Sequence, residues 1–253
     1  MSNANALEFV EAAPLSLRGG VETAAMIEAE GTPPLALDQL PDGVVSGNTL
    51  IDYSAARMEV RGGLSLALIF AGRAADAAMK EGDDEQDWFA AYQQSLGKLG
   101  FRASQTATTL NRFRKRGVMV HKALVPFLMT ALGGVGVGPV IISLLEQIKD
   151  MDADRSWITL FDQESRHFSS REMHFAAVSS DESESVIRHV AARLMVENDE
   201  TNVLFLSITD ATAEFESATT TFSANNGLLA VLEEPLKQRL TTDALAFIQE
   251  AKL

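Results

Sequence analysis

The sequence predicts an α+β protein, because helical patterns fill most of its first half and strand patterns fill most of its second half. In the first half, apolar residues recur every three or four positions, which is the spacing of one buried helix face. In the second half, apolar and polar residues alternate, as in antiparallel strands. We therefore expect N-terminal helices that include an apolar helical hairpin, followed by a mainly antiparallel sheet and a C-terminal helix.

The first 48 residues differ from the rest of the chain. They carry seven acidic residues against one basic residue and are interrupted by four prolines. This composition predicts an extended acidic N-terminal arm over residues 1–48, with a short helix at 20–30, and a single α+β domain over residues 49–253. The arm is expected to contribute little to the core.

Two helices are expected next. Residues 52–80 space leucine and alanine for one buried face. A second helix lies between the turn at 82–84 and Gly100, and it carries a stripe of Trp88, Tyr92, Leu96 and Leu99. Such a stripe is typical of core packing.

Strand patterns follow at several places. The threonine-rich residues 101–113 fit a strand or an extended connection, and residues 157–161 and 171–178 are predicted to form strands joined by a hairpin turn. Residues 202–208 are predicted to be a buried strand and 211–223 a half-exposed one. Residues 185–197 fit either an amphipathic helix or a long strand. Helical residues broken by a proline close the chain after a turn at 225–227.

The most unusual segment is 112–148, where a basic cluster leads into a long apolar run. Residues 123–145 contain no charge, and on length alone they match the roughly 20 residues of a bilayer-spanning helix. Four glycines and Pro139 fall within residues 133–139, and such residues break helices. The segment is therefore expected to form two short apolar helices joined by a flexible turn, packed inside the protein in its soluble state.

This segment also supplies the candidate residues for contact with a membrane or a partner. Basic residues at the start of an apolar hairpin can meet lipid headgroups, although such a cluster is more commonly a solvated helix start. The candidates are Arg112, Arg114, Lys115, Arg116, Val125, Phe127, Leu128, Gly134, Gly136, Ile141 and Ile142.

Charge and composition exclude several classes of function. The formal net charge of −14 opposes binding to nucleic acid over the general surface. The absence of cysteine excludes disulfides, thiol catalysis and cysteine lipidation. The first 15 residues show no Sec-type signal, so we expect synthesis in the cytoplasm and, if the protein is exported, a route other than Sec.

Motifs for catalysis, cofactors and metals are not found. The glycine turn lacks the third glycine of a dinucleotide fingerprint and the lysine of a P-loop. Asp150, Asp152 and Asp154 have the spacing of a calcium loop, but its glycine and closing glutamate are replaced. No HExxH or GxSxG occurs, although His167 and His174 could meet across a hairpin. We predict no cofactor and no metal, and we assign no catalytic residue.

Residues 64–76, with the sequence LSLALIFAGRAAD, and 87–101, beginning DWFAAY, resemble a family of bacterial secreted virulence proteins typified by Evf. The resemblance implies an α+β fold and a host-directed or membrane-directed activity without a known catalytic site. That family attaches to membranes through an acylated cysteine, which this chain lacks. No functional residue is therefore carried over.

The sequence as a whole predicts a non-enzymatic protein-interaction or host-directed effector that acts through contact with a protein partner or with membrane lipid. One alternative is a pore-forming or membrane-perturbing toxin that inserts residues 118–148. The other is a hydrolase or small-ligand binder whose site is assembled in space and leaves no sequence motif.

Overall fold

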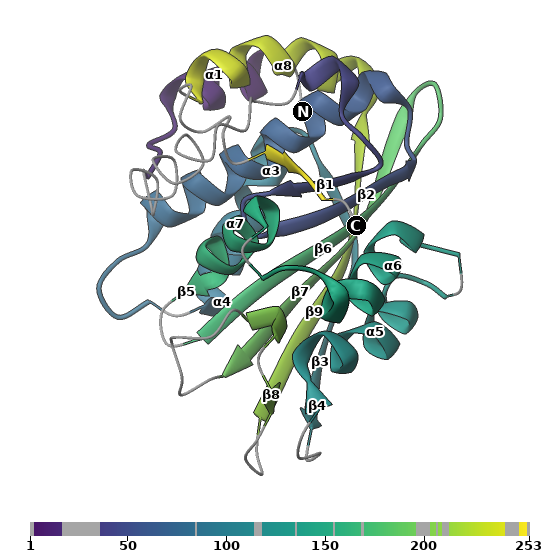
Figure 1. Ribbon diagram of the computed structural model, residues 1–253. Coiled ribbons are helices and arrows are strands. Elements are labelled where there is room, and N and C mark those ends of the chain that lie inside the picture. Colours follow the sequence, from purple (N-terminus) through teal and green to yellow (C-terminus); the bar gives the residue numbers. More distant parts are fainter. Residues whose placement is uncertain are drawn as a thin grey trace.

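The computed structural model describes residues 3–16, 36–83, 85–113, 118–134, 136–153, 155–167, 170–195, 203–205, 207–208, 213–240 and 248–251. One mainly antiparallel sheet runs through the molecule, and helices cover both of its faces (Figure 1). The predicted α+β class is confirmed.

The large sheet has the strand order β10-β1-β2-β6-β7-β9-β3. Strand β5 pairs with the first two residues of β6. Strands β2 and β6 run parallel, whereas the other pairs of described strands are antiparallel. The strands of this sheet are β1 (Gly43–Ser46), β2 (Thr49–Ala55), β3 (Arg102–Phe113), β5 (Arg166–His167), β6 (Ser170–Ser180), β7 (Glu184–Met195), β9 (Ala213–Asn225) and β10 (Ile248–Glu250).

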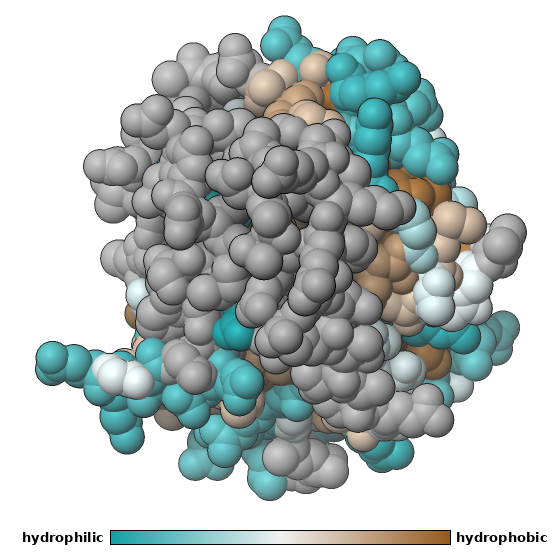
Figure 2. All heavy atoms as spheres, turned by 90° about the horizontal axis from the view of Figure 1, so that it is seen from below, coloured by the Kyte–Doolittle hydropathy of each residue, from teal (hydrophilic) through white to brown (hydrophobic). Residues whose placement is uncertain are grey.

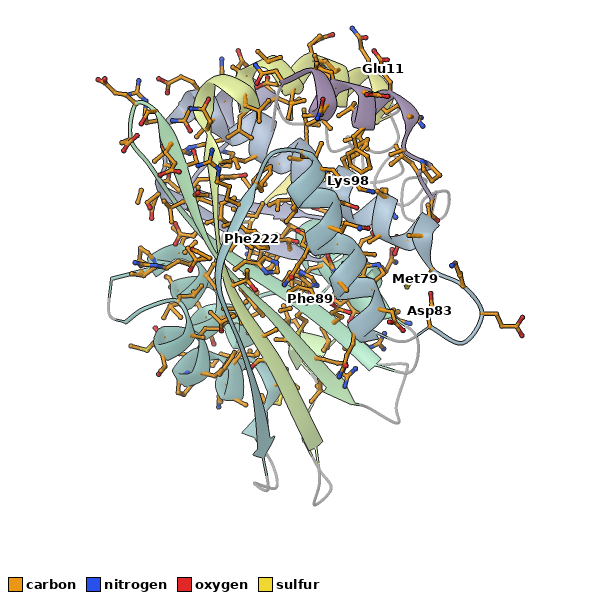
Figure 3. The ribbon with its side chains drawn as sticks, turned by 180° about the vertical axis from the view of Figure 1, so that it is seen from behind. Glu11, Met79, Asp83, Phe89, Lys98 and Phe222 are labelled. Atoms are coloured by element: carbon orange, nitrogen blue, oxygen red, sulfur yellow. The ribbon has the colours of Figure 1, made fainter. Side chains whose placement is uncertain are left out.

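Four helices lie on one side of the sheet: α1 (Asn3–Ala12), α3 (Met58–Ala78), α4 (Glu85–Lys98) and α8 (Asn226–Arg239). Helix α3 packs against both α4 and α8, and α1 packs against α8. Figure 3 shows α4 crossing the strands on this side, with Phe89 on its inner surface. The aromatic stripe of α4 is core, as its spacing predicted, since Trp88 and Tyr92 are each only 2% exposed.

The opposite side carries α7 (Ser156–Ser165), α5 (Val120–Ala131) and α6 (Pro139–Gln147). Phe161 of α7 packs on Phe175 of β6, with 6.0 Å between ring centroids. A separate two-stranded ribbon of β4 (Val118–Met119) and β8 (Ser207–Ile208) stands beside α5. Three short 3-10 helices complete the described elements: η1 (Leu37–Gln39), η2 (Ile148–Asp150) and η3 (Val203–Phe205).

Three predicted elements need correction. Residues 157–161 are helical in α7, because apolar pairs three residues apart fit a buried helix face as well as a strand. Residues 203–205 form η3 and residues 207–208 form the two-residue strand β8, where one buried strand was expected over 202–208. The helix predicted from residue 52 begins at Met58, because residues 52–55 belong to β2. The segment 185–197, left open between helix and strand, is a strand in its described part.

The prediction of an extended arm over residues 1–48 is wrong for its described parts. Helix α1 buries Ala6 and Val10 against the α3, α4 and α8 layer, and β1 pairs with both β2 and β10 inside the sheet. Arg239 of α8 donates a hydrogen bond to the Ala13 carbonyl at 2.8 Å. The ammonium group of Lys98 stands over the ring of Phe9, 4.9 Å from the ring centroid. The predicted helix at 20–30 lies outside the described residues.

We predict that removal of residues 1–12 lowers the free energy of unfolding by at least about 2 kcal/mol, the value of burying one aliphatic side chain such as Val10. Urea denaturation followed by circular dichroism measures this change. Glu8→Ala, an exposed substitution on the same helix, is the matched control and should leave the midpoint within experimental error. If the truncated protein had the same urea midpoint as the full chain, residues 1–12 would contribute little to the core, as an extended arm would.

Candidate functional site

Helices α5 and α6 pack against each other, and together with the turn 132–138 we call them the helix pair. Residue 135 of this turn lies outside the described residues. The inner surface of the helix pair is apolar and joins the main core; its fully or almost fully buried members are Leu124, Leu128, Leu132, Ile141, Leu144 and Leu145. The helix pair is thus anchored to the core by these buried apolar residues.

A buried carboxylate ties α6 to the sheet. Asp52 of β2 is 2% exposed, and its Oδ2 accepts a hydrogen bond from the Val140 backbone N–H at 2.6 Å. Its Oδ1 accepts from the Ser54 N–H at 2.8 Å. Because the first N–H groups of a helix are unpaired and carry partial positive charge, an anionic acceptor at this position stabilises the α6 terminus.

The turn of the helix pair depends on glycine. Gly138 has φ of 67°, and a Cβ there would lie 2.9 Å from Cδ1 of Leu132. Gly134 and Gly136 face open space, but their φ values of 107° and 90° are conformations that other L residues rarely adopt. Under the turn lies a cavity of about 100 Å³, which Asp52 and Arg188 help to line. Substitution of these glycines would therefore strain the backbone whatever the function of the turn.

Between residues 123 and 145 the outer surface of the helix pair carries no charged side chain and is partly exposed. Val125, Phe127 and Ile142 are only partly buried. In the view from below, hydrophobic residues reach the surface on the right-hand side, where α5 and α6 lie in Figure 1 (Figure 2). The two polar side chains here bond within their own helices: Thr130 Oγ1 donates to the Pro126 carbonyl at 3.2 Å, and Ser143 Oγ accepts from Gln147 at 2.9 Å.

The structure divides the predicted contact residues into three groups. Leu128 and Ile141 point into the core with no exposed surface. The partly exposed apolar residues and the two glycines lie together on the outer surface; they are Val125, Phe127, Gly134, Gly136 and Ile142. For the basic cluster, Arg112 belongs to β3 but its side chain is not described, and Arg114, Lys115 and Arg116 lie outside the described residues.

His121, in the first turn of α5, is buried, and its Nδ1 lies 2.7 Å from the Leu204 carbonyl oxygen. Burial lowers the pKa of His121, although the hydrogen bond to Leu204 opposes this shift. The neutral imidazole is therefore favoured in the folded state. Its contribution to stability is present above the ordinary histidine pKa and is lost as the pH falls below it.

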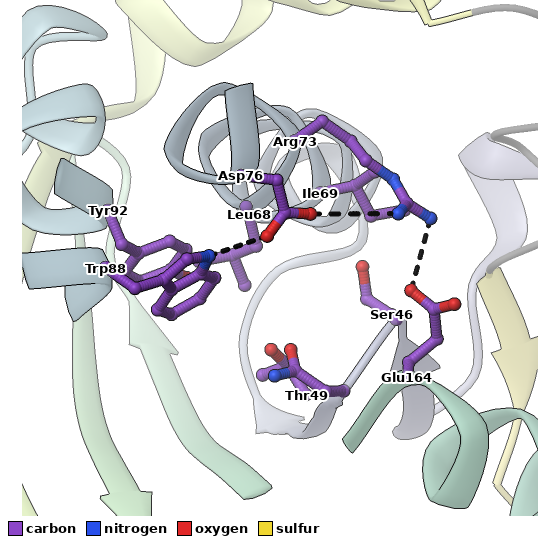
Figure 4. A pocket seen from close by; sticks show the side chains of 12 residues that line it. Ser46, Thr49, Leu68, Ile69, Arg73, Asp76, Trp88, Tyr92 and Glu164 are labelled. Atoms are coloured by element: carbon purple, nitrogen blue, oxygen red, sulfur yellow. Dashed lines mark hydrogen bonds and ion pairs between the residues drawn. The ribbon is translucent and has the colours of Figure 1, made fainter. Parts of the chain in front are cut away.

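A second polar site lies between α3, α4, α7 and the β1–β2 turn (Figure 4). Arg73 Nη2 is 3.1 Å from Glu164 Oε2, and Arg73 Nη1 is 4.0 Å from Asp76 Oδ2. Trp88 Nε1 donates to Asp76 Oδ1 at 2.7 Å. The cavity beside these groups measures about 40 Å³, which is room for a few water molecules. Because the charged groups engage one another, this site is best explained as a tie between the helices.

A buried polar chain on the α4 side of the sheet was not predicted from the sequence. In it, His174 of β6 meets His189 of β7, with Nδ1 and Nε2 3.0 Å apart. The side chain of His167, which could have met His174 across a hairpin, lies outside the described part of the structure. His174 Nε2 is 2.9 Å from Glu172 Oε1. The signal was the turn at 181–183, since counting strand register outward from it places these residues on one face of the β6–β7 hairpin.

Within the described residues, no three histidine, aspartate or glutamate side chains are placed to hold a metal ion together. None of the helices described is both long and apolar enough to cross a membrane.

The fold and its site define a mainly antiparallel α+β protein with an apolar helix pair at its surface. No family model and no curated protein matches the chain. Solved structures of similar fold include a delta-endotoxin, 13% identical with a TM-score of 0.43 over 77% of this chain and 86% of that chain. The activated Cyt2Ba monomer from Bacillus thuringiensis subsp. israelensis is 14% identical with a TM-score of 0.32, over 52% of this chain and 77% of that chain.

The Evf virulence factor is 12% identical with a TM-score of 0.34, over 85% of each chain. It represents the family that residues 64–101 resemble, so the suspected resemblance is matched by a similarity between structures. At these identities and TM-scores, the similar structures assign neither a site nor an activity to this chain.

Asp52→Ala is predicted to destabilise the fold by about 2–3 kcal/mol, because hydrogen bonds to a charged group are each worth about that much and the N–H of Val140 loses its acceptor. Chemical denaturation of both proteins measures the difference. Asp83→Ala is the matched control, since Asp83 also accepts from a backbone N–H, that of Lys80 at 2.9 Å, but on the exposed surface. Equal effects of the two substitutions would show that Asp52 has no special role in holding the helix pair.

Proposed function

We propose that this protein is a non-enzymatic effector that acts by contact, and that the outer surface of the helix pair is where it meets a lipid membrane. The observation that carries the proposal is the uncharged outer surface formed by residues 123–145 on two adjacent helices. The apolar side chains Val125, Phe127 and Ile142 would enter the boundary between headgroups and acyl chains.

The hydrogen bonding of the helix pair favours lipid over a protein partner. A protein interface contains about one hydrogen bond per 100–200 Å² and therefore needs side chains with free donors or acceptors. On this surface Thr130 and Ser143 are already bonded within their helices. A surface whose few polar side chains make hydrogen bonds within their own helices is suited to a medium that offers no hydrogen bonds.

Charges at the ends of the uncharged run would set its depth. Lys122 and Glu146 are exposed immediately outside residues 123–145, and Lys149 follows one turn later. Long lysine side chains can keep their ammonium groups among the headgroups while the helix lies at the interface. The overall charge of −14 repels anionic surfaces, so we expect zwitterionic membranes to be bound at least as well as anionic ones.

Vesicle flotation tests the proposal. We predict that the wild type floats with phosphatidylcholine vesicles and that Val125→Glu lowers the partition constant, obtained from the bound fraction at several lipid concentrations, about tenfold or more. The reason is that burying a valine is worth about 1.5 kcal/mol and a carboxylate resists transfer. Val231→Glu on α8 is the matched control, since Val231 is 43% exposed on a helix of the opposite side. Thermal unfolding of each variant confirms that the fold is kept.

Failure of the wild type to float with either phosphatidylcholine or phosphatidylglycerol vesicles would refute membrane contact. Protein contact would then be the better explanation of the surface. Release of a dye trapped in the vesicles separates simple contact from the pore-forming alternative, in which residues 118–148 leave the core and the vesicles leak.

A further inference from the structure

The buried chain of Glu172, His174 and His189 has a defined direction. When Glu172 is a carboxylate and both imidazoles are neutral, the carboxylate can only accept, so Nε2–H of His174 donates to it. Nδ1 of His174 then accepts from Nε2–H of His189. Nδ1 of His189 carries no proton in this arrangement, and it is buried without a hydrogen-bond partner among the described residues.

Two more polar atoms beside this chain are also buried and have no hydrogen-bond partner in the part of the protein that the structure describes. They are the second carboxylate oxygen of Glu172 and the hydroxyl of Tyr92. The Tyr92 ring lies 5.6 Å from the ring of His174 and 5.8 Å from that of His189, measured between centroids. Each partnerless polar atom costs free energy in a buried site. Among the described residues, buried polar atoms without a hydrogen-bond partner are therefore concentrated between α4 and the sheet.

An aromatic cover from α4 keeps water away from the two imidazoles. Trp88 packs edge-on against His174 at 5.5 Å, and Phe89 stacks on His189 at 6.1 Å. From the sheet, Phe222 of β9 packs against His189, with 5.9 Å between ring centroids. Both histidines have no exposed surface. Water can therefore reach the side chains of His174 and His189 only if α4 moves away from the strands.

The charged and titratable groups around the chain are few. Glu172 is on the same strand as His174, and Arg193 of β7 is the cross-strand neighbour of Glu172. Helix α4 contributes Tyr92, and Asp76 of α3 accepts a hydrogen bond from Trp88. The neighbours from β2 and β9 are uncharged; they are Thr49, Thr220 and Phe222.

Protonation disrupts this arrangement. A proton added at Nδ1 of His189 would make that ring a buried cationic donor with no acceptor for this N–H among the described residues. Burial, together with the neighbouring His174, holds the pKa of His189 well below its ordinary value. A state in which α4 has moved away and His189 meets water would protonate near the ordinary pKa of about 6.5.

We propose that Glu172, His174 and His189 form a proton-sensitive latch that keeps α4 on the sheet at neutral pH and releases it in acid. The sign follows from linkage: the closed state binds fewer protons than the released state, so its advantage is present above pH 6.5 and is lost as the pH falls. For each proton bound only by the released state, its population rises about tenfold per pH unit. Release bares the apolar inner surface of α4 and the strand face that it covers, independently of what the helix pair contacts.

Tryptophan fluorescence reports this movement directly, because one of the two tryptophans of the chain, Trp88, lies on α4 itself. The other, Trp157, lies on α7 on the opposite side of the sheet. In a Trp157→Phe background, Trp88 of α4 is the single reporter. We expect its quenching by acrylamide to increase severalfold between pH 7.5 and 5, while the far-ultraviolet circular dichroism of the sheet persists. The same variant carrying His189→Gln, which keeps an N–H near the position of Nε2 but does not titrate, should remain protected over this range.

His121→Asn is the matched control, since it removes the buried histidine on the other side of the sheet and keeps an N–H for the Leu204 carbonyl. It should leave the rise in Trp88 quenching unchanged. The latch is refuted if Trp88 stays protected down to pH 5, if it becomes exposed only with loss of the whole secondary structure, or if His189→Gln does not alter the pH profile.

A measurement on the unaltered protein keeps the test valid if a variant fails to fold. Nitrogen-15 spectra of the imidazole rings should show both His174 and His189 protonated on Nε2 at pH 7.5. A proton on Nδ1 of His189 at that pH would contradict the direction of the chain and, with it, the latch.

Discussion

Strand β6 is buried on both of its faces from Arg171 to Val178, and the rest of the structure depends on this constraint. A strand of this kind needs a covering layer on each side. Here α4 covers one face and α7 covers the other. The two faces differ in chemistry. Met173 and Phe175 make an ordinary apolar contact with the α7 layer, whereas Glu172 and His174 place polar groups under α4.

The helix pair is attached to this framework at its margin. Its inner residues extend the core, and Asp52 holds the start of α6 to the strand next to β6. Packing explains the inner residues but not the uncharged character of the outer ones, because charged residues on the outer surface would be compatible with the same packing. The lack of charge on the outer residues 123–145 is therefore the feature that needs a functional explanation.

The sequence was informative where a pattern is local and long. The stripe of α4 repeats over three turns, and the alternation of β9 extends over more than ten residues, so both could be predicted. Residues 157–161 are too short for their periodicity to decide between helix and strand. Strand β1 was hidden inside an acidic, proline-containing region, because its burial depends on β10, about 200 residues further along the chain.

The same reasoning explains what could be known of the site. The uncharged run and its glycines are visible in the sequence, but which of Leu128 and Phe127 faces outward depends on how α5 sits on the sheet. The pairing of His174 with His189 requires the register of a hairpin, and the cover over them comes from a helix some 80 residues earlier. Contacts between distant segments are not encoded in any one stretch of sequence.

The absence of cysteine allows a direct test of the central claim, that the outer surface of the helix pair meets lipid. A single cysteine placed at Val125 and labelled with a dye that brightens in apolar surroundings should increase in emission and shift to the blue when phosphatidylcholine vesicles are added. The same label at Val231 should not respond. If the label at position 125 is as insensitive to vesicles as the one at position 231, the helix pair does not contact the membrane and the account is wrong.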